Sequence, residues 1–322
     1  MQQILRPACC THQHHLNYRK EGIHMATFCP TARVEKLLLA SDRSAFNEGA
    51  IREALSLAKQ CSSSLTVMSV IEVNPEFDAM APQIVEKIDA EVREHLEAIK
   101  QRAKKAGVDC ETVVRRGDEA FALIAQEAEE RKTTMIIMGR RGRTGLSRLM
   151  MGSVTARVIG QAPCNVLVVP RAAQFSCKKI LVATDGSRYG DAAVSEAMGI
   201  AKRCGSELTI LSVVPSESVA AMDIVHSELR KDLIVEKELK IAEMAVKEAK
   251  DAAAKEGITV SGLVLGGKPS EGILEAAKEK KADLIILGTL GKTGMDRLLM
   301  GSVTERVIVT AECAVLAVKT AA

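Results

Sequence analysis

The sequence predicts an α/β protein of two tandem doubly wound domains, each with a five-stranded parallel sheet. Three observations support this fold class. Short, continuously apolar, β-branched segments alternate with segments of helical periodicity, which is typical of strands covered on both faces. Their order is β-α-β-α-β-α-β-α-β, and the whole pattern occurs twice. The 322 residues are enough for two domains that each bury a core.

The two copies are recognised by pairs of matching segments. The segment EKLLLASDRS at 35–44 matches KKILVATDGS at 178–187, with an offset of 185 − 42 = 143 residues. The glycine-rich segments that begin at Gly139 and Gly288 match with an offset of 288 − 139 = 149 residues. The second copy therefore carries six additional residues in its middle. Repeats this long indicate a duplicated domain, because solenoid repeats are far shorter.

Each copy is expected to form one domain. The first is placed at 32–172 and the second at 173–322, after an N-terminal extension of residues 1–31 that we expect to be disordered. The extension contains Cys9, Cys10, His12, His14 and His15. These are metal-ligand types, but their spacing matches no standard zinc module. The sequence therefore favours an extension, with Met25 as a candidate start of translation, over a metal site.

The strands are predicted from the apolar runs. In the first copy these runs lie at 37–40, 65–71, 111–114, 134–138 and 164–169. In the second copy they lie at 180–183, 208–214, 259–265, 283–287 and 313–318. The crossovers between parallel strands are expected to be right-handed.

The helices are predicted from apolar residues at helical spacing. Two such segments are AFNEGAIREALSLAKQC at 45–61 and YGDAAVSEAMGIAKRC at 189–204. One face of a further helix is formed by Ile84, Ile88, Val92, Leu96 and Ile99. The additional residues of the second copy fall in a long charged helix near 224–257. This helix would either lie over the mouth of its site or be an ordinary surface helix, and the sequence favours the second interpretation.

Composition excludes several classes of function. The net charge of 44 − 41 = +3 and an aromatic content of 2% argue against nucleic-acid binding and an anionic membrane surface. No apolar run approaches the roughly 20 residues of a membrane helix, and the first residues lack the apolar core of a secretory signal. The nine cysteines are scattered without a C-x-x-C pair, which suits a reducing compartment. We therefore expect a cytoplasmic protein.

Carboxylates and glycines follow the predicted strands at corresponding positions. Asp42 and Asp185 end the first strands, and Gly139 and Gly288 end the fourth strands. In a doubly wound sheet, ligands bind beyond the carboxyl ends of the strands, where the strand order reverses. If the first and fourth strands are neighbours there, the aspartate and the glycine loop flank one crevice.

The complete glycine pattern, G-x-x-G-x9-G-S before a helix, favours phosphate binding. Gly139 and Gly142 are expected to permit a positive φ and to remove Cβ atoms that would keep a phosphate from the backbone. Gly152–Ser153 and Gly301–Ser302 would open helices, whose unpaired N–H groups attract anions. The spacing of Ser302 and Glu305 suggests a capping box. The cations that directly follow the second glycine of each loop, and that could reach a terminal phosphate, are Arg143 and Lys292.

The glycines also have other possible explanations. Glycines between strands and helices are common in ordinary turns, and duplication copies a motif whether or not both copies function. The segment GTLGKTG is not a Walker loop, which has four residues between Gly and Gly-Lys-Thr. No G-x-G-x-x-G follows the first strand of either copy. Phosphate binding by at least one of the two copies is the favoured interpretation.

These motifs together resemble the universal stress protein family. The strand-end aspartate in ATDGS, the second strand in SVIE and SVVP, and G-x-x-G-x9-G-S-V-T carry the resemblance, which covers about residues 32 to 320. Two copies suggest a tandem member of the ATP-binding type. The family has Rossmann-like domains similar to adenine nucleotide alpha hydrolases, with five parallel strands in the order 3-2-1-4-5. Its members dimerise through the fifth strand, so 164–169 and 313–318 are expected to pair within the chain, with further homodimers left open.

The resemblance also implies a ligand and its contacts. ATP, with Mg²⁺, would place its adenosine near Asp42 or Asp185 and its adenine on the backbone of Val70 or Val213. Its phosphates would lie on loops formed by Gly139, Gly142, Gly152, Ser153 and Val154, or by Gly288, Gly291, Gly301, Ser302 and Val303. Arg140, Arg141 and Leu290 depart from the family pattern. An arginine there would either add phosphate contacts or crowd the site.

The expected function is an ATP-binding stress-response or signalling module that acts through a change of conformation or partner. Two alternatives are a weak ATPase and a nucleotide-free structural hub. His95 and His226 lie in helical segments without a matching nucleophile, and a solvated surface position is expected for each. The sequence therefore favours a binding protein over an enzyme, with slow ATP hydrolysis left open.

Overall fold

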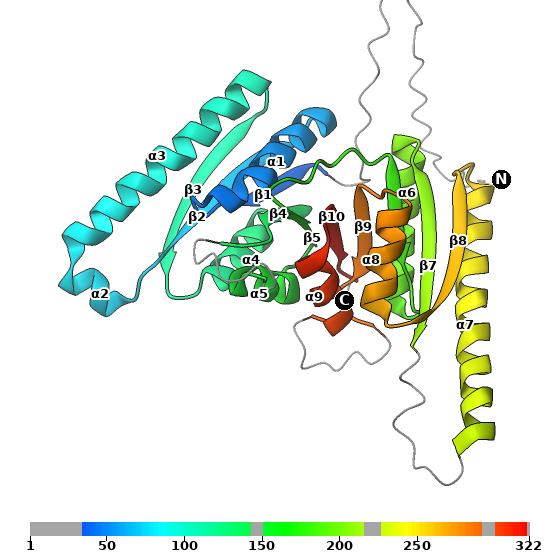
Figure 1. Cartoon of the computed structure of the whole chain (residues 1–322). Coiled ribbons are helices and arrows are strands. Elements are labelled where there is room, and N and C mark those ends of the chain that lie inside the picture. Colours follow the sequence, from blue (N-terminus) through cyan, green and yellow to red (C-terminus); the bar gives the residue numbers. More distant parts are fainter. Residues whose placement is uncertain (1–33, 143–150, 216–226, 292–299, 321–322) are drawn as a thin grey trace, which may run out of the picture.

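The computed structural model describes residues 34–142, 151–215, 227–291 and 300–320 (Figure 1). The elements of the first half are β1 (Lys36–Ala40), η1 (Ala45–Asn47), α1 (Glu48–Cys61), β2 (Ser64–Glu72), α2 (Pro75–Met80), α3 (Pro82–Ala106), β3 (Cys110–Gly117), α4 (Ala120–Glu130), β4 (Met135–Gly139), α5 (Ser153–Gln161) and β5 (Asn165–Val169). Those of the second half are β6 (Lys179–Ala183), α6 (Arg188–Cys204), β7 (Glu207–Pro215), α7 (Ser227–Lys255), β8 (Val260–Gly267), α8 (Pro269–Glu279), β9 (Leu284–Gly288), α9 (Ser302–Thr310) and β10 (Ala314–Val318).

The strands form one sheet in the order β3-β2-β1-β4-β5-β10-β9-β6-β7-β8. Within each half all neighbouring strands are parallel and follow the order 3-2-1-4-5. The predicted doubly wound α/β fold is therefore confirmed. Each predicted strand is present, and the largest extension is at β3, which continues past 114 to Gly117.

The two halves meet at their fifth strands. β5 and β10 pair antiparallel, with Leu167 opposite Leu316 in the register (Figure 1). The expected pairing of 164–169 with 313–318 within the chain is therefore confirmed. Each strand covers the edge that the other would expose.

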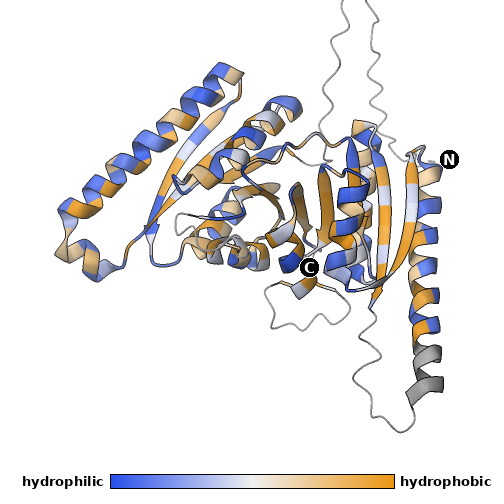
Figure 2. Cartoon of the chain, viewed as in Figure 1, coloured by the Kyte–Doolittle hydropathy of each residue, from blue (hydrophilic) through white to orange (hydrophobic). Residues whose placement is uncertain are grey.

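Helices cover both faces of the sheet. One core layer packs α1, α3, α6 and α7 against alternate strand residues such as Leu37 and Leu39. The other packs α4, α5, α8 and α9 against the intervening residues, such as Leu38 and Ala40. Figure 2 shows apolar strands between helices whose outward faces are hydrophilic. The alternation of strand side chains explains why continuous apolar runs are required here.

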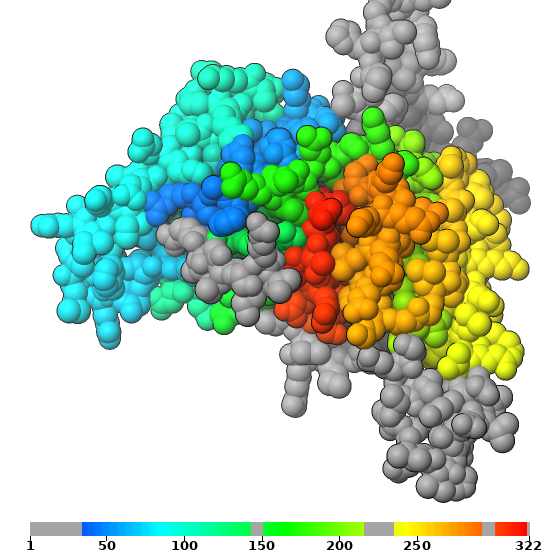
Figure 3. Space-filling model, viewed as in Figure 1, coloured from blue at the N-terminus to red at the C-terminus, as the bar shows by residue number. Residues whose placement is uncertain are grey.

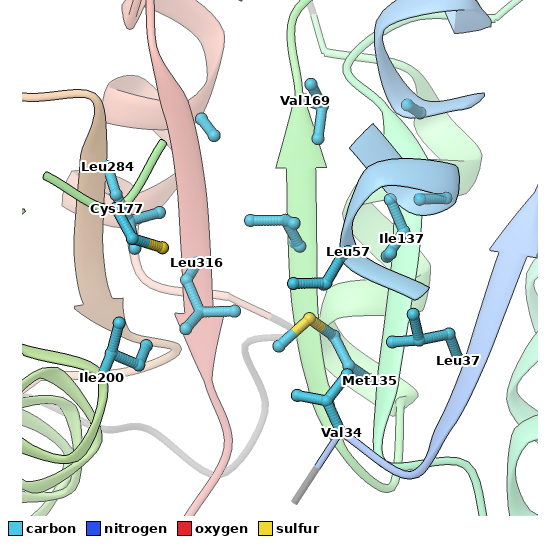
Figure 4. Close-up of a cluster of buried hydrophobic side chains, with 14 of the residues drawn as sticks. Val34, Leu37, Leu57, Met135, Ile137, Val169, Cys177, Ile200, Leu284 and Leu316 are labelled. Carbon is cyan, nitrogen blue, oxygen red and sulfur yellow. The ribbon is translucent and has the colours of Figure 1, made fainter. Parts of the chain in front are cut away.

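Both core layers continue across the junction of the halves. The buried side chains Leu57, Ile137 and Val169 belong to the same layer as Leu284 and Leu316 (Figure 4). In Figure 3 the C-terminal elements, in red, lie between the green atoms of the first half and the orange atoms of the second. The sheet and its core are therefore continuous through the two copies.

The structure bears on two expectations, one about the cysteines and one about membrane helices. Among the described cysteines, Cys61 is disulfide-bonded, and the free thiols are Cys110, Cys164, Cys177, Cys204 and Cys313. Disulfides are rare in a reducing compartment, so the bonded Cys61 does not support that expectation. The cytoplasmic location stays a prediction. None of the helices in the described ranges has the length and apolarity that crossing a membrane requires.

Candidate functional sites at the strand ends

Each half has a pocket at the carboxyl ends of its strands, where its first and fourth strands lie side by side. The first pocket has a volume of about 200 Å³, and its lining includes Asp42, Val70, Gly139, Gly142, Gly152, Ser153 and Val154. The second has a volume of about 420 Å³, and its lining includes Asp185, Val213, Gly288, Gly291, Gly301, Ser302 and Val303. The expected crevice is therefore present in both halves. Arg143, Lys292 and His226 lie outside the described residues.

The second glycine of each loop rests directly on the strand-end carboxylate. A Cβ atom at Gly142 would lie 2.9 Å from Oδ2 of Asp42, and a Cβ atom at Gly291 would lie 2.8 Å from Oδ2 of Asp185. Both distances are shorter than Cβ contacts allow, so any side chain would displace the carboxylate or the loop. The other oxygen, Oδ1, accepts a 3.0 Å hydrogen bond from the N–H two residues later in each half. The carboxylate is therefore held by a main-chain hydrogen bond, and the glycine leaves room for it.

The expectation of positive φ at Gly139 and Gly142 is wrong. Neither glycine has a positive φ, and the left-handed residue near the site is Gly186, with φ of 75°. The counterpart of Gly186 in the first half, Arg43, takes the same conformation with φ of 67°. Close approach is the requirement at Gly288, where a Cβ atom would lie 2.7 Å from the carbonyl oxygen of Tyr189, whereas a Cβ atom at Gly139 would meet nothing nearer than 3.4 Å.

The third glycine of each loop does not offer its own amide to a ligand. The N–H of Gly152 donates to the carbonyl of Arg140 at 3.1 Å, and the N–H of Gly301 donates to that of Thr289 at 2.9 Å. These bonds close the loops onto the helix starts. The first residues of α5 and α9 follow, and the N–H groups of a helix's first turn have no partner within the helix. An anion at these pockets would therefore meet the amides of Ser153 and Ser302 and of the next residues.

The expected capping box at Ser302 and Glu305 is also wrong. Gly301 is the N-cap of α9, Ser302 is already helical, and no side chain caps this end. Instead Thr304 donates its hydroxyl to the carbonyl of Gly288 at 2.8 Å, and Thr155 donates to that of Gly139 at 3.1 Å. The threonine of G-S-V-T thus ties each helix start to a strand end, a role that spacing alone does not reveal.

Val70 and Val213 lie where a neighbouring strand has ended. The last pair of β1 and β2 is Ala40 with Met68, and the N–H of Ser41 donates to the carbonyl of Met68 at 2.8 Å. Successive residues of a parallel strand direct their main-chain groups to alternate neighbours. Val70, two residues beyond Met68, therefore turns its N–H and C=O toward the side where β1 has ended. The register of β6 and β7, which ends at Leu211, gives Val213 the same arrangement.

His95 is not a solvated surface residue, contrary to expectation. It is half-buried, and its Nε2 lies 2.8 Å from the hydroxyl of Ser41, next to Asp42. Burial lowers the pKa of His95 below its ordinary value of 6.5, and the charge of Arg43 lowers it further. The imidazole is therefore neutral at pH 7.

The two pockets differ in the side chains around the aspartate. Glu238 and Ala242 of α7 line the second pocket, so the long helix does lie over its site, the interpretation that the sequence disfavours. Asn47 of the first pocket corresponds to Gly190 in the second. A Cβ atom at Gly190 would lie 2.5 Å from the hydroxyl of Thr184, which explains the missing side chain.

The residues that depart from the family pattern have separate positions. Arg141 lines the first pocket, and Leu290 lines the second. Arg140 neither adds to the first pocket's lining nor crowds it. Its guanidinium donates to the carbonyl of Ala311, at the end of α9, at 2.7 Å.

Comparisons with known proteins agree with this geometry. The sequence profile of the universal stress protein family matches residues 33–170 and again 176–319. A universal stress protein of Methanocaldococcus jannaschii is 41% identical over 143 residues, which cover 44% of this chain and 82% of that protein. A putative universal stress protein of Staphylococcus epidermidis is 33% identical over 148 residues, covering 45% of this chain and 86% of that protein.

Solved structures share the arrangement of both halves. The crystal structure of a universal stress protein from Archaeoglobus fulgidus matches with a TM-score of 0.67 and 22% identity, over 90% of this chain and 98% of that one. A putative universal stress protein from Pseudomonas aeruginosa matches with a TM-score of 0.60 and 20% identity, over 89% of this chain and 94% of that one. At these identities the likeness concerns the fold.

Proposed function

The chain belongs to the universal stress protein family, and we propose that each of its two pockets binds ATP. The observation that carries the proposal is the contact between a loop glycine and the strand-end aspartate, at Gly142 with Asp42 and at Gly291 with Asp185. This contact occurs in both copies, although the intervening side chains differ. Glycines without Cβ atoms therefore lie beside a fixed carboxylate and a helix start in each pocket. Such an arrangement suits a ligand that joins a hydroxylated ring to a phosphate chain.

The nucleotide has a defined orientation in this proposal. The adenine would contact the main-chain groups of Val70 or Val213, where the neighbouring strand has ended. The ribose hydroxyls would donate to the carboxylate of Asp42 or Asp185. The phosphates would accept from the first amides of α5 or α9, including those of Val154 and Val303, and Mg²⁺ would accompany them.

The pockets differ in how readily they admit this ligand. Ligand pockets commonly have volumes of about 300–1,000 Å³, and the second pocket, at about 420 Å³, lies in that range. The first, at about 200 Å³, is smaller, so ATP there requires outward movement of lining side chains. Arg141 supplies the first pocket with a positive charge for the phosphates. Glu238 instead gives the second pocket a carboxylate from α7.

The proposed role is a stress-response or signalling module in which bound ATP changes conformation or partner. α7 is the element through which the second pocket would act, because its residues line that pocket and its outer side is exposed. Weak hydrolysis and a nucleotide-free structural role are the alternatives. Nucleotide analysis of gently purified protein separates binding from the structural role, since co-purified ATP is expected only if a pocket binds it.

Calorimetry with Mg-ATP tests the proposal directly. We expect two ATP per chain for the wild type, one for Gly142→Ala or Gly291→Ala, and none for the double variant, because each Cβ atom displaces the carboxylate it meets. Gly266→Ala is the matched control, since a Cβ atom there has no neighbour within 4 Å. Absence of heat from the wild type would rule out the proposal. Phosphate release that persists in the double variant would show that any ATPase activity lies elsewhere.

A further inference from the structure

Two cations cross the junction between the halves, and each reaches the end of a helix in the opposite half. Arg140, in the first glycine loop, donates to the carbonyls of Ala311 at 2.7 Å and Ile308 at 3.5 Å, at the end of α9. Lys319, just after β10, donates through Nζ to the carbonyls of Gly160 at 2.6 Å and Ile159 at 3.4 Å, in the last turn of α5. The last carbonyls of a helix lack partners within it and carry partial negative charge, so both contacts are favourable.

Both cations are partly dehydrated. Burial lowers the pKa of the Arg140 guanidinium, and the charge of Arg141 lowers it further. Burial also lowers the pKa of the Lys319 ammonium, against the opposing effect of Cys164. A cation that gives up water is held to its helix end by these hydrogen bonds more firmly than an exposed one. We therefore expect these two contacts to hold the cation and the helix end together more firmly than pairs between exposed side chains do.

The helices that receive these cations are the ones that open at the pockets. α9 begins at Ser302 in the second pocket, and α5 begins at Ser153 in the first. A helix of this length spans about 13 Å at 1.5 Å per residue. The buried Val307 and Ile308 of α9 pack in the core layer shared by both halves. A shift at the far end of such a short, packed helix therefore displaces its beginning.

The first loop is connected to α9 through Arg140. Its neighbours Gly139 and Arg141 line the first pocket, and its carbonyl accepts the N–H of Gly152 at the entrance to α5. A ligand that draws Gly142 toward Ser153 would therefore move the backbone of Arg140. The side chain would transmit this movement to α9 and so to the second pocket.

The second loop is connected to α5 by a different route. The N–H of Thr289, the counterpart of Arg140, donates to the carbonyl of Val318 at 3.2 Å. The next residue is Lys319, whose N–H donates to Oδ1 of Asn165 at 3.0 Å and whose side chain reaches the end of α5. The second loop is thus connected to the helix that opens at the first pocket.

From these contacts we infer that the two pockets are energetically coupled through Arg140 and Lys319, so that filling one changes the affinity of the other. The inference rests on the proposed function, since the ligand is the ATP proposed above. Arg140 and Lys319 are positioning residues, because neither is among the residues that line the two proposed ATP pockets. Coupling of binding free energies is reciprocal, so the same factor must be measured from either pocket.

The test measures the ATP affinity of the second pocket in two proteins. In one the first pocket can bind ATP, and in the other it is blocked. Calorimetric titration with Mg-ATP gives the second-pocket affinity in Gly142→Ala and the stepwise affinities in the wild type. We expect these second-pocket affinities to differ by about 5-fold or more, the lower end of typical coupling. In the Arg140→Ala, Lys319→Ala background the difference is expected to vanish while both pockets still bind. Arg306→Ala, which removes an exposed charge from α9, is the matched control and should retain the difference.

Hydrogen exchange without ligand gives a second readout. Arg140→Ala is expected to speed exchange of the amides of Gly301 and Glu305, which donate to the carbonyls of Thr289 and Gly301 at the opposite end of α9 from the lost contact, whereas Arg306→Ala is not. Equal second-pocket affinities in the wild type and Gly142→Ala, or ATP at only one wild-type pocket, would overturn the coupling and leave ATP binding intact. If no ATP binds, the proposed function fails instead, and unchanged exchange at Gly301 and Glu305 would then overturn the connection by itself.

Discussion

Individual glycines at the two sites are explained by contact rather than by backbone conformation. Gly142 and Gly291 have no room for a Cβ atom against the aspartates, whereas the left-handed position nearby is held by Gly186 in one half and by Arg43 in the other. A non-glycine residue in the left-handed region costs roughly 1–2 kcal/mol. Arg43 also pairs with Glu91 of α3, at 2.7 Å. Sequence spacing located glycines that line the two pockets, but only packing shows which contacts each one makes.

His95 is a second case in which the surroundings of one residue decide its role. Its neighbour in space is Ser41, 54 positions away in the sequence, at the strand end next to Asp42. No periodicity connects the two, since His95 belongs to a helix that looks amphipathic in the ordinary way. The half-buried imidazole therefore has a pKa below 6.5 that could not be anticipated.

His95 predicts a pH dependence of stability. With its folded pKa depressed, the unfolded chain binds more protons just below pH 6.5, so stability falls as the pH is lowered through that region. We expect the wild type to lose more stability between pH 7 and pH 5 than His95→Gln, which does not titrate. Thermal melts at the two pH values measure this, and equal losses would contradict the assignment.

At the scale of elements, α4 of the first half is fastened by a buried carboxylate, Glu127, that the corresponding position of the second half does not have. Glu127 of α4 is 2% exposed and receives Arg131 of its own helix and Arg115 of β3, both at 2.5 Å. Burial opposes ionisation of Glu127, but hydrogen bonds from Arg131 and Arg115 outweigh it and hold its pKa below the ordinary value. Its counterpart at an offset of 149 is Ala276. Helix positions were predictable from apolar spacing, whereas this fastening of α4 to the sheet edge was not.

Removing the Glu127 carboxylate is expected to destabilise the first half. Breaking a fully buried pair costs about 3–5 kcal/mol, and the partial exposure of both arginines reduces this to about 2 kcal/mol for Glu127→Ala. Glu130→Ala, which removes the exposed partner of Arg115, is the control and should cost under about 1 kcal/mol. Urea unfolding at pH 7 measures the loss of unfolding free energy in both variants. Similar losses would show that the buried pair contributes no more to stability than the exposed one.

For the whole molecule, the pairing of β5 with β10 joins the two copies through one sheet and two shared core layers. Both core layers contain residues of both halves, and Leu167 and Leu316 are each 1% exposed at the junction. The family resemblance led us to expect this pairing. The crossed contacts of Arg140 and Lys319 follow from it, because they exist only once the fifth strands are side by side.

The continuous core predicts a single unfolding transition. Leu316→Asp places a carboxylate in the shared layer and is expected to cost at least about 4 kcal/mol and to separate the melting of the two halves. The same change at the partly exposed Leu265 of the outermost strand, β8, serves as the control and should leave one transition. Differential scanning calorimetry distinguishes these cases. Two separate transitions in the wild type would contradict a shared core.

Several predictions lie beyond what the fold decides. The domain boundaries at 32–172 and 173–322, the roles of the site residues, ATP, Mg²⁺ and further homodimers stay predictions.

The short helix α2 was missed, although Asn74 followed by proline is a usual helix start and its side chain accepts the N–H of Phe77 at 2.7 Å. A helix this short leaves no periodic apolar pattern, so only its cap could have revealed it.

The sequence by itself determined the strands, the duplication, the topology of each half and the residues gathered at the strand ends. These depend on local apolar periodicity and on repeated motifs, which are written along the chain. Only the tertiary structure decided how the glycine amides are used, that Arg140 turns away from its own pocket, that His95 meets Ser41 and that α7 covers the second pocket. These features depend on distances between residues far apart in sequence, which the packing of helices on a common sheet sets and local patterns do not encode.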